Sequence, residues 1–282
     1  MSRTPTSRED VLALIEAHPM GDTPRTMREA FPHRTGPQPK GEAHPFGLAF
    51  GSGPKVLFFH GGGYVFGSPE SHGHAAARLA AAGLRVVLPR YPLAPERPWP
   101  AQLDAARAAL DAVEGSVAVA GISAGGHLAL NLALAARGRV AALALMSPNT
   151  DRTGLSRTRE ANANADAMND DASDRALGEM ALGGLRDDDP EKSPLLADLR
   201  VLPPTFLSVG LDEVLLDDTL LLSRRLGLAG VETRLETVPG AFHMAHLWPQ
   251  ALPPAGAALD RMGAWLRGML AGRRPAGDVL LS

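Results

Sequence analysis

The sequence predicts an α/β fold in which helices cover both faces of a mostly parallel central sheet. Short apolar runs bounded by Gly or Pro alternate along the chain with longer stretches whose apolar residues recur at helical spacing. Continuous apolar runs such as VLFF are typical of strands buried on both faces, whereas the alternating VETRLETV is typical of an outer strand. We expect strands at 56–59, 85–88, 116–120, 141–146, 205–209 and 231–238, and helices at 74–82, 100–113, 124–136 and 217–229.

Two segments interrupt this alternation. Residues 1–45 hold one amphipathic stretch, at 9–18, followed by a Pro-, Gly- and His-rich passage without periodicity. Residues 151–202 are rich in Asp and Glu and are longer than a connection between two strands requires. This inserted segment is either a solvated acidic linker or a lid. The sheet-forming domain is expected to comprise residues 46–150 and 203–282.

The composition limits which covalent nucleophile and which binding partners are expected. The 282 residues are 45% hydrophobic and 21% charged, which is ordinary for a packed globular protein. The net charge of −3 gives no general attraction to nucleic acid or to anionic lipid, so neither is expected as a partner. Because the chain has no cysteine, a covalent nucleophile must be Ser, Thr, Lys or a carboxylate.

The distribution of apolar residues indicates a location. The amino-terminal MSRTPTSRED is followed by only five consecutive apolar residues, which is too short for a signal-peptide core. The longest apolar run, at 140–146, is far too short to cross a bilayer. These features predict a cytoplasmic protein.

The pentapeptide GISAG around Ser123 is the first sign of chemistry. From 14 serines and 30 glycines, a G-x-S-x-G is expected about 0.16 times by chance. This one follows a predicted strand and opens a predicted helix, which is the setting of a nucleophile elbow. A glycine-rich turn that binds phosphate is the alternative interpretation.

A second motif, His60 followed by three glycines, stands directly after the strand VLFF. It is expected only about 0.01 times by chance. Glycines at a strand end allow backbone N–H groups to turn toward a site, where they can bind the oxyanion of a tetrahedral intermediate together with the N–H of Ala124. We expect His60 to support this loop rather than to take part in chemistry.

An activated serine requires a histidine base, which in this fold follows it in the chain. Only three histidines follow Ser123. His127 lies one turn into the elbow helix and is expected to pack there. His243 follows the last strand, where a base should lie, and His246 is the second choice. The pair H-x-x-H has no third ligand at the spacing of a known zinc motif, so no metal is expected.

The carboxylate that orients the histidine should follow the strand at 205–209. Four acidic residues compete there. Asp217 and Asp218 fit the cap and first turn of the next helix, where negative charge suits the helix dipole. Asp212 and Glu213 lie in the loop before it, and the residues alone leave both open.

Taken together, these motifs resemble the hormone-sensitive-lipase-like branch of the α/β-hydrolases, bacterial carboxylesterases. The likeness covers about residues 55–270. It is carried by the motifs HGGGYVFGS, YPLAPERPWPAQLDAA, GISAGGHLAL, SPLLADLRVLPPTFLSVGLDEVLLDD and VPGAFHMAH, which occur in the family's order.

The resemblance implies an α/β-hydrolase fold with a cap made from residues 1–45 and 151–202. It also implies an oxyanion hole at Gly62, Gly63 and Ala124, and no cofactor. The family's acid stands thirty residues before its histidine, so the resemblance favours Glu213 over Asp212 beside Ser123 and His243.

Four positions depart from the family's pattern. Glu213 replaces an aspartate, Val214 a proline, Ile122 a polar residue and Met244 a common glycine. The first of these departures bears on which residue is the acid more than on the function.

The resemblance predicts a serine carboxylesterase that acts on small-molecule esters with short- to medium-chain acyl groups. Apolar candidates for the pocket, such as Tyr64 and Phe66, favour this size. An amidase or formamidase on the same scaffold, or a ligand-binding relative without catalysis, are the alternatives. Some members of the family pair through their last strand and helix, which adds a homodimer to the expectations.

Overall fold

The protein, described here by a computed structural model over residues 4–272, is built around one mixed sheet. Within these residues the sheet has eight strands in the order β1-β2-β4-β3-β5-β6-β7-β8. The β1–β2 and β2–β4 pairs are antiparallel, whereas β3 to β8 run parallel to one another. The predicted α/β fold is confirmed. The strands are β1 Glu42–His44, β2 Gly47–Phe50, β3 Lys55–Phe59, β4 Arg85–Pro89, β5 Val117–Ile122, β6 Val140–Met146, β7 Thr205–Gly210 and β8 Thr233–Val238.

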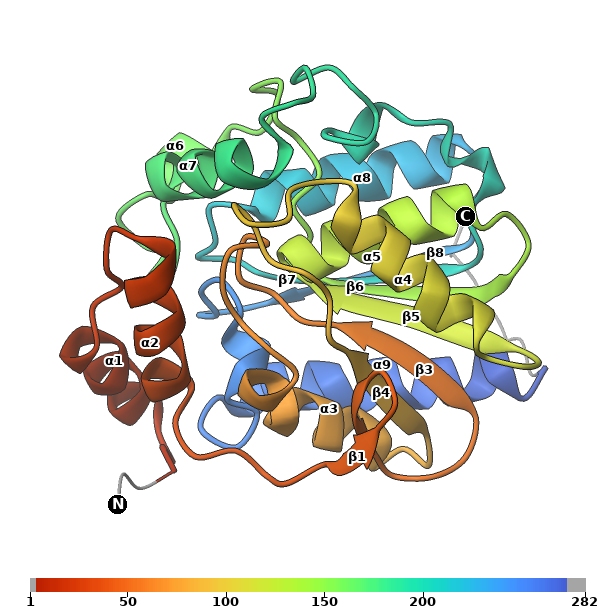
Figure 1. Ribbon diagram of the computed structural model, residues 1–282, viewed down its shortest axis with the longest axis horizontal. Coiled ribbons are helices and arrows are strands. Elements are labelled where there is room, and N and C mark those ends of the chain that lie inside the picture. The colour runs from red at the N-terminus through yellow and green to blue at the C-terminus, as the bar shows by residue number, and fades with distance from the viewer. Residues whose placement is uncertain (1–3, 273–282) are drawn as a thin grey trace, which may run out of the picture.

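Helices cover both faces of the sheet (Figure 1). On one face α3 and α9 pack together, and on the other lie α4, α5 and α8. Each face has its own apolar core, and the central strands contribute alternate residues to the two cores. The helices are α1 Arg8–Ala17, α2 Pro24–Thr35, α3 Gly73–Ala80, α4 Ala101–Asp111, α5 Ala124–Ala135, α6 Thr158–Ala161, α7 Asp171–Leu182, α8 Leu216–Leu228 and α9 Pro253–Leu270.

The expectation that one helix alone precedes residue 45 is wrong. The passage without periodicity contains α2, which begins with a capping box from Thr23 to Thr26 and has Pro24 in its first turn. Its polar composition hides it from a search for apolar spacing. The short β1 and β2, and the long α9, also lie outside the expected elements. The predicted outer strand at 231–238 begins two residues late, at Thr233, and β8 is an edge strand as expected.

The two segments that interrupt the alternation lie side by side. Helices α1 and α2, red in Figure 1, and α6 and α7, green, gather beyond one end of the sheet. A hydrogen bond joins Arg34 of α2 to the sulfur of Met168 in the inserted segment. The inserted segment is therefore packed against the amino-terminal helices and is not a free linker.

Buried charges attach the inserted segment to the sheet domain. Arg159 donates to the carboxylates of Asp174, at 2.7 Å, and Asp218, at 3.1 Å. All three side chains are buried. Asp218 also accepts the backbone N–H groups of Thr150 and Asp151. Asp218 lies in the first turn of α8 as expected, but its charge is used for this internal network rather than for the helix dipole alone.

None of the helices within residues 4–272 combines the length and the apolar character that a membrane span requires.

Candidate active site

The site forms at the carboxyl ends of the parallel strands. Ser123 follows β5, the glycine loop follows β3, Glu213 follows β7 and His243 follows β8. Parallel strands place their carboxyl ends at one edge of a sheet, so residues far apart in the sequence meet there.

Ser123 stands on a sharp turn between β5 and α5. Its backbone has φ 55° and ψ −123°, a conformation that a residue with a side chain adopts only under strain. The flanking glycines permit this turn. A Cβ on Gly121 would lie 2.0 Å from the carbonyl oxygen of Gly125, and a Cβ on Gly125 would lie 2.1 Å from that of Phe59. The G-x-S-x-G pattern is thus a steric requirement of the turn.

The structure brings Ser123, His243 and Glu213 together in a chain of hydrogen bonds. Nε2 of His243 lies 2.8 Å from Oγ of Ser123, and Nδ1 lies 2.9 Å from Oε2 of Glu213. All three side chains are buried. This arrangement lets the imidazole accept a proton from the serine while the carboxylate holds the opposite nitrogen.

Further hydrogen bonds fix the carboxylate of Glu213. Its Oε1 accepts from Oγ of Ser147 at 2.7 Å and from the N–H of Gly210 at 2.6 Å. Ser147 was not among the residues that the sequence indicated. Its signal was only positional, because it directly follows β6 at the same edge. Asp212, the alternative acid, is half-buried, and its backbone N–H donates to the carbonyl oxygen of Ala241. The carboxylate that contacts His243 belongs to Glu213.

The charges around His243 favour its protonated form. Burial is the largest single influence and lowers its pKa, but the hydrogen bond and charge of Glu213, with the charges of Asp166 and Asp174, outweigh it. The net effect raises the pKa of His243 above its usual value. An imidazolium formed during proton transfer is therefore stabilised.

The other two histidines after Ser123 occupy different environments. Nε2 of His246 lies 2.9 Å from Oγ of Ser208, and burial lowers the pKa of His246 to about 4. His127 packs in α5, as expected, and burial lowers its pKa to about 3. The partner of the Ser123 hydroxyl is Nε2 of His243 and neither of these two histidines.

The glycine loop presents unused donors beside Ser123. Across residues 4–272, no protein acceptor is hydrogen-bonded to the backbone N–H of Gly62, Gly63 or Ala124. Gly62 and Gly63 both have positive φ, at 115° and 58°. These three N–H groups are the ones that the resemblance implies as donors to an oxyanion.

Histidine and aromatic side chains contact this loop and the residue before it. His72 accepts the N–H of Gly61 at 2.9 Å, and the ring of His60 stacks on Tyr91 with centroids 4.0 Å apart. On the other side the hydroxyl of Tyr64 lies 2.6 Å from Nδ1 of His127. His60 thus supports the loop, as its position in the sequence suggested.

Met244, which follows His243, has a backbone conformation that favours glycine. It has φ 60° in the left-handed region, where a side chain costs about 1 kcal/mol or more and glycine does not. In this chain the methionine side chain is buried and lines the space around Ser123 and His243.

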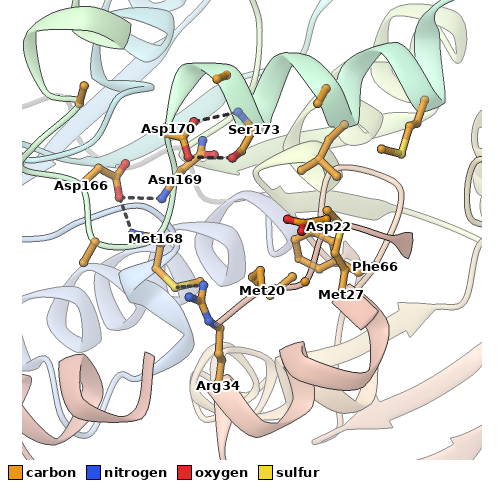
Figure 2. Close-up of a pocket in the computed structure, with 17 residues that line it drawn as sticks. Met20, Asp22, Met27, Arg34, Phe66, Asp166, Met168, Asn169, Asp170 and Ser173 are labelled. Atoms are coloured by element: carbon orange, nitrogen blue, oxygen red, sulfur yellow. Dashed lines mark hydrogen bonds between the residues drawn. The ribbon is translucent and has the colours of Figure 1, made fainter. Parts of the chain in front are cut away.

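A cavity of about 700 Å³ opens between the amino-terminal helices and the inserted segment (Figure 2). Ser123 and His243 line a narrower space of about 40 Å³. The two share a wall of mainly apolar side chains, with one guanidinium and one amide: Met20, Arg34, Phe66, Met168, Asn169 and Leu177.

No group of three or more His, Asp or Glu side chains in the described part of the chain is arranged to hold a metal ion.

Comparison with known proteins places this chain in a family. Residues 56–247 match the family model described as alpha/beta hydrolase fold. The chain is 34% identical over 226 residues to an acetyl-hydrolase of Streptomyces hygroscopicus, covering 76% of each protein. It is 33% identical over 229 residues to the carboxylesterase NlhH of Mycobacterium tuberculosis, covering 74% of this chain and 71% of the relative.

A solved structure shares nearly the whole architecture. It is that of an esterase from the bacterial hormone-sensitive lipase family, with a TM-score of 0.84 and 31% sequence identity. The superposition covers 96% of this chain and 100% of the other. On its sequence and its fold, this chain belongs to the α/β-hydrolases and, among them, to the bacterial hormone-sensitive lipase family.

Proposed function

We propose that this protein is a serine carboxylesterase that cleaves short- to medium-chain acyl esters through an acyl-enzyme intermediate. The observation that carries the proposal is the hydrogen-bonded series of Ser123, His243 and Glu213, which lies next to three unused backbone donors. Relatives named carboxylesterase and acetyl-hydrolase support the same reaction class.

In the first step Oγ of Ser123 attacks the ester carbonyl carbon while Nε2 of His243 takes the hydroxyl proton. The carbonyl oxygen becomes an oxyanion that accepts hydrogen bonds from the N–H groups of Gly62, Gly63 and Ala124. Glu213 holds Nδ1 of the imidazolium and balances its charge. The C–O bond to the alcohol then breaks, and the alcohol leaves with the proton from His243.

In the second step water attacks the acyl-serine. His243 takes a proton from the water, and the same backbone donors bind the second oxyanion. Collapse of this intermediate breaks the bond between the acyl carbon and Oγ of Ser123. The serine recovers its proton from His243, and the carboxylic acid is released.

The cavities support the proposed substrate size. The narrow space at Ser123 accommodates only a small group, whereas the adjoining cavity of about 700 Å³ accommodates a longer arm. Methionine and leucine side chains in its lining suit an aliphatic or aromatic group. Residues 1–45 and 151–202 supply most of this lining, so we assign them to a cap over the domain formed by residues 46–150 and 203–282.

Hydrolysis of p-nitrophenyl acetate, butyrate, octanoate and palmitate tests the proposal, with Ser123→Ala as the control. We expect rapid cleavage of the shorter esters, a decline for the longest, and complete loss in the variant. A folded wild-type protein that cleaves none of them, or a variant that cleaves them equally well, would reject it. Turnover of a matched amide faster than the ester would favour an amidase, and saturable binding of the esters without turnover would favour a ligand-binding protein.

A further inference from the structure

One carboxylate of the inserted segment touches the backbone of two catalytic loops. Oδ1 of Asp166 accepts the N–H of His243 at 3.0 Å, and its Oδ2 accepts the N–H of Val214 at 3.0 Å. Oδ1 also accepts from Met168 at 3.0 Å and from Asn169 at 3.3 Å within its own segment. Figure 2 shows these last two bonds at the side of the large cavity.

The two loops held by Asp166 carry the acid and the base. Val214 directly follows Glu213 in the loop after β7, and His243 lies in the loop after β8. The hydrogen bond of 2.9 Å between Glu213 and His243 depends on the spacing of these loops. A charged acceptor that binds one N–H from each loop fixes that spacing more firmly than neutral contacts would.

A second side chain of the inserted segment holds the acid loop independently. Nδ2 of Asn162 donates to the carbonyl oxygen of Leu211 at 3.0 Å and to that of Glu213 at 2.8 Å. In addition, the hydroxyl of Thr158 donates to the carbonyl oxygen of Val214 at 2.9 Å. Residues 158–166 therefore bind both donors and acceptors of the backbone around Glu213.

We propose that Asp166 is a positioning residue, which couples the seating of the inserted segment to the alignment of Glu213 with His243. The inference rests on the proposed ester hydrolysis, because it assigns Asp166 to the machinery of that reaction. Asp166 is not assigned a contact with the substrate's reacting atoms. It acts through the backbone of the two loops and through its negative charge near His243.

The substitution Asp166→Asn tests this with little change of shape. An amide has one acceptor oxygen and an NH₂ group, so in either orientation it places donors against the N–H of His243 or that of Val214. We expect kcat for p-nitrophenyl butyrate to fall about 10- to 100-fold, as displacement of a catalytic group by about 1 Å can do, with KM nearly unchanged.

The pH profile supplies a second readout, which responds to the negative charge of Asp166. The groups that influence the titration of His243 are Glu213 after β7, Asp174 on α7, His246 in the following turn and Asp166 itself. The Asp166→Asn substitution changes only Asp166 among these groups. Loss of its negative charge lowers the pKa of His243, so the acidic limb of the kcat/KM profile should move to lower pH.

Two further variants keep the test decisive. Asp188→Asn makes the same substitution in the inserted segment, but at an exposed residue whose carboxylate pairs with Arg186, and should leave kcat and the pH profile unchanged. Asn162→Ala removes the contact with the acid loop without touching His243 or its charge. It should lower kcat and move the acidic limb less than Asp166→Asn does, because the negative charge of Asp166 is kept, which tests the coupling even if Asp166→Asn does not fold.

The outcomes separate this inference from the proposed function. If the wild-type protein cleaves esters and Asp166→Asn matches it in kcat and pH profile, the inference is rejected alone. Equal losses in Asp166→Asn and Asp188→Asn, or an unchanged kcat in Asn162→Ala, would also overturn it. A folded wild-type protein without ester hydrolysis would reject the proposed function first, and this inference with it.

Discussion

Replacing Glu213 by Gln changes the hydrogen bonding at a fixed position, so its effect can be worked out from the structure. Two donors, the hydroxyl of Ser147 and the N–H of Gly210, point at Oε1. The amide oxygen must stay with them, which places the NH₂ group against Nδ1 of His243. That nitrogen must then accept, so the proton moves to Nε2, and the imidazole can no longer take a proton from Ser123.

The expected loss is about 10⁴-fold in kcat, equivalent to about 5.5 kcal/mol. The wrong tautomer accounts for this loss, because an imidazole with its proton on Nε2 cannot act as the base for Ser123, and replacing the acid of a serine triad by its amide has an effect of this order. This magnitude is sufficient to distinguish an essential acid from a bystander.

The assay is steady-state hydrolysis of p-nitrophenyl acetate, with circular dichroism to verify that the variant is folded. Asp212→Asn is the matched control, because the Asp212 side chain is absent from the contacts of His243, and we expect it to retain nearly full activity. A folded Glu213→Gln protein within about tenfold of the wild-type kcat would refute the reasoning. A large loss in Asp212→Asn would instead assign the acid to that residue.

Three further results are expected. Arg159→Met leaves the buried carboxylates of Asp174 and Asp218 without this partner. Urea denaturation should show a loss of about 3–5 kcal/mol in the free energy of unfolding, and a loss under about 1 kcal/mol would contradict this expectation. Gly125→Ala should abolish folding or activity, because its Cβ would overlap a backbone oxygen, and a soluble, fully active variant would show the turn to be adaptable. His243 must be neutral to act as the base, and its pKa is raised above its usual value. As the pH is lowered, kcat/KM should therefore fall with a midpoint above about pH 6.5. A midpoint below that pH would contradict the charges assigned around His243.

Much of the central architecture could be predicted because its signals are local. The continuous apolar run of β3 and the glycines around Ser123 each reflect a requirement of the adjacent backbone. The helix α2 was missed because its polar residues carry no apolar periodicity, and its capping residues were the remaining signal. Helices that owe their stability to contacts with another segment leave little trace in the local sequence.

The residues of the site also divide into those with a local signal in the sequence and those without one. The serine and the glycine loop are contiguous motifs, and the histidine follows from chain order. The contacts of Ser147 and Asp166 depend on which strands and segments become neighbours, and single serines or aspartates in polar passages do not reveal this. The choice between Asp212 and Glu213 rested on counting residues from the histidine, and it is their side-chain contacts that distinguish them in the structure.

The proposed reaction depends on Ser123 as the nucleophile, and covalent labelling tests this role most directly. Diethyl p-nitrophenyl phosphate transfers its phosphoryl group to an activated serine, and the label can be located by mass spectrometry of peptides. We predict one diethylphosphoryl group per chain, on Ser123, with activity lost in proportion to labelling and no label in Ser123→Ala. Ester hydrolysis that persists after Ser123 is fully labelled, or activity lost through a label on another residue, would contradict it.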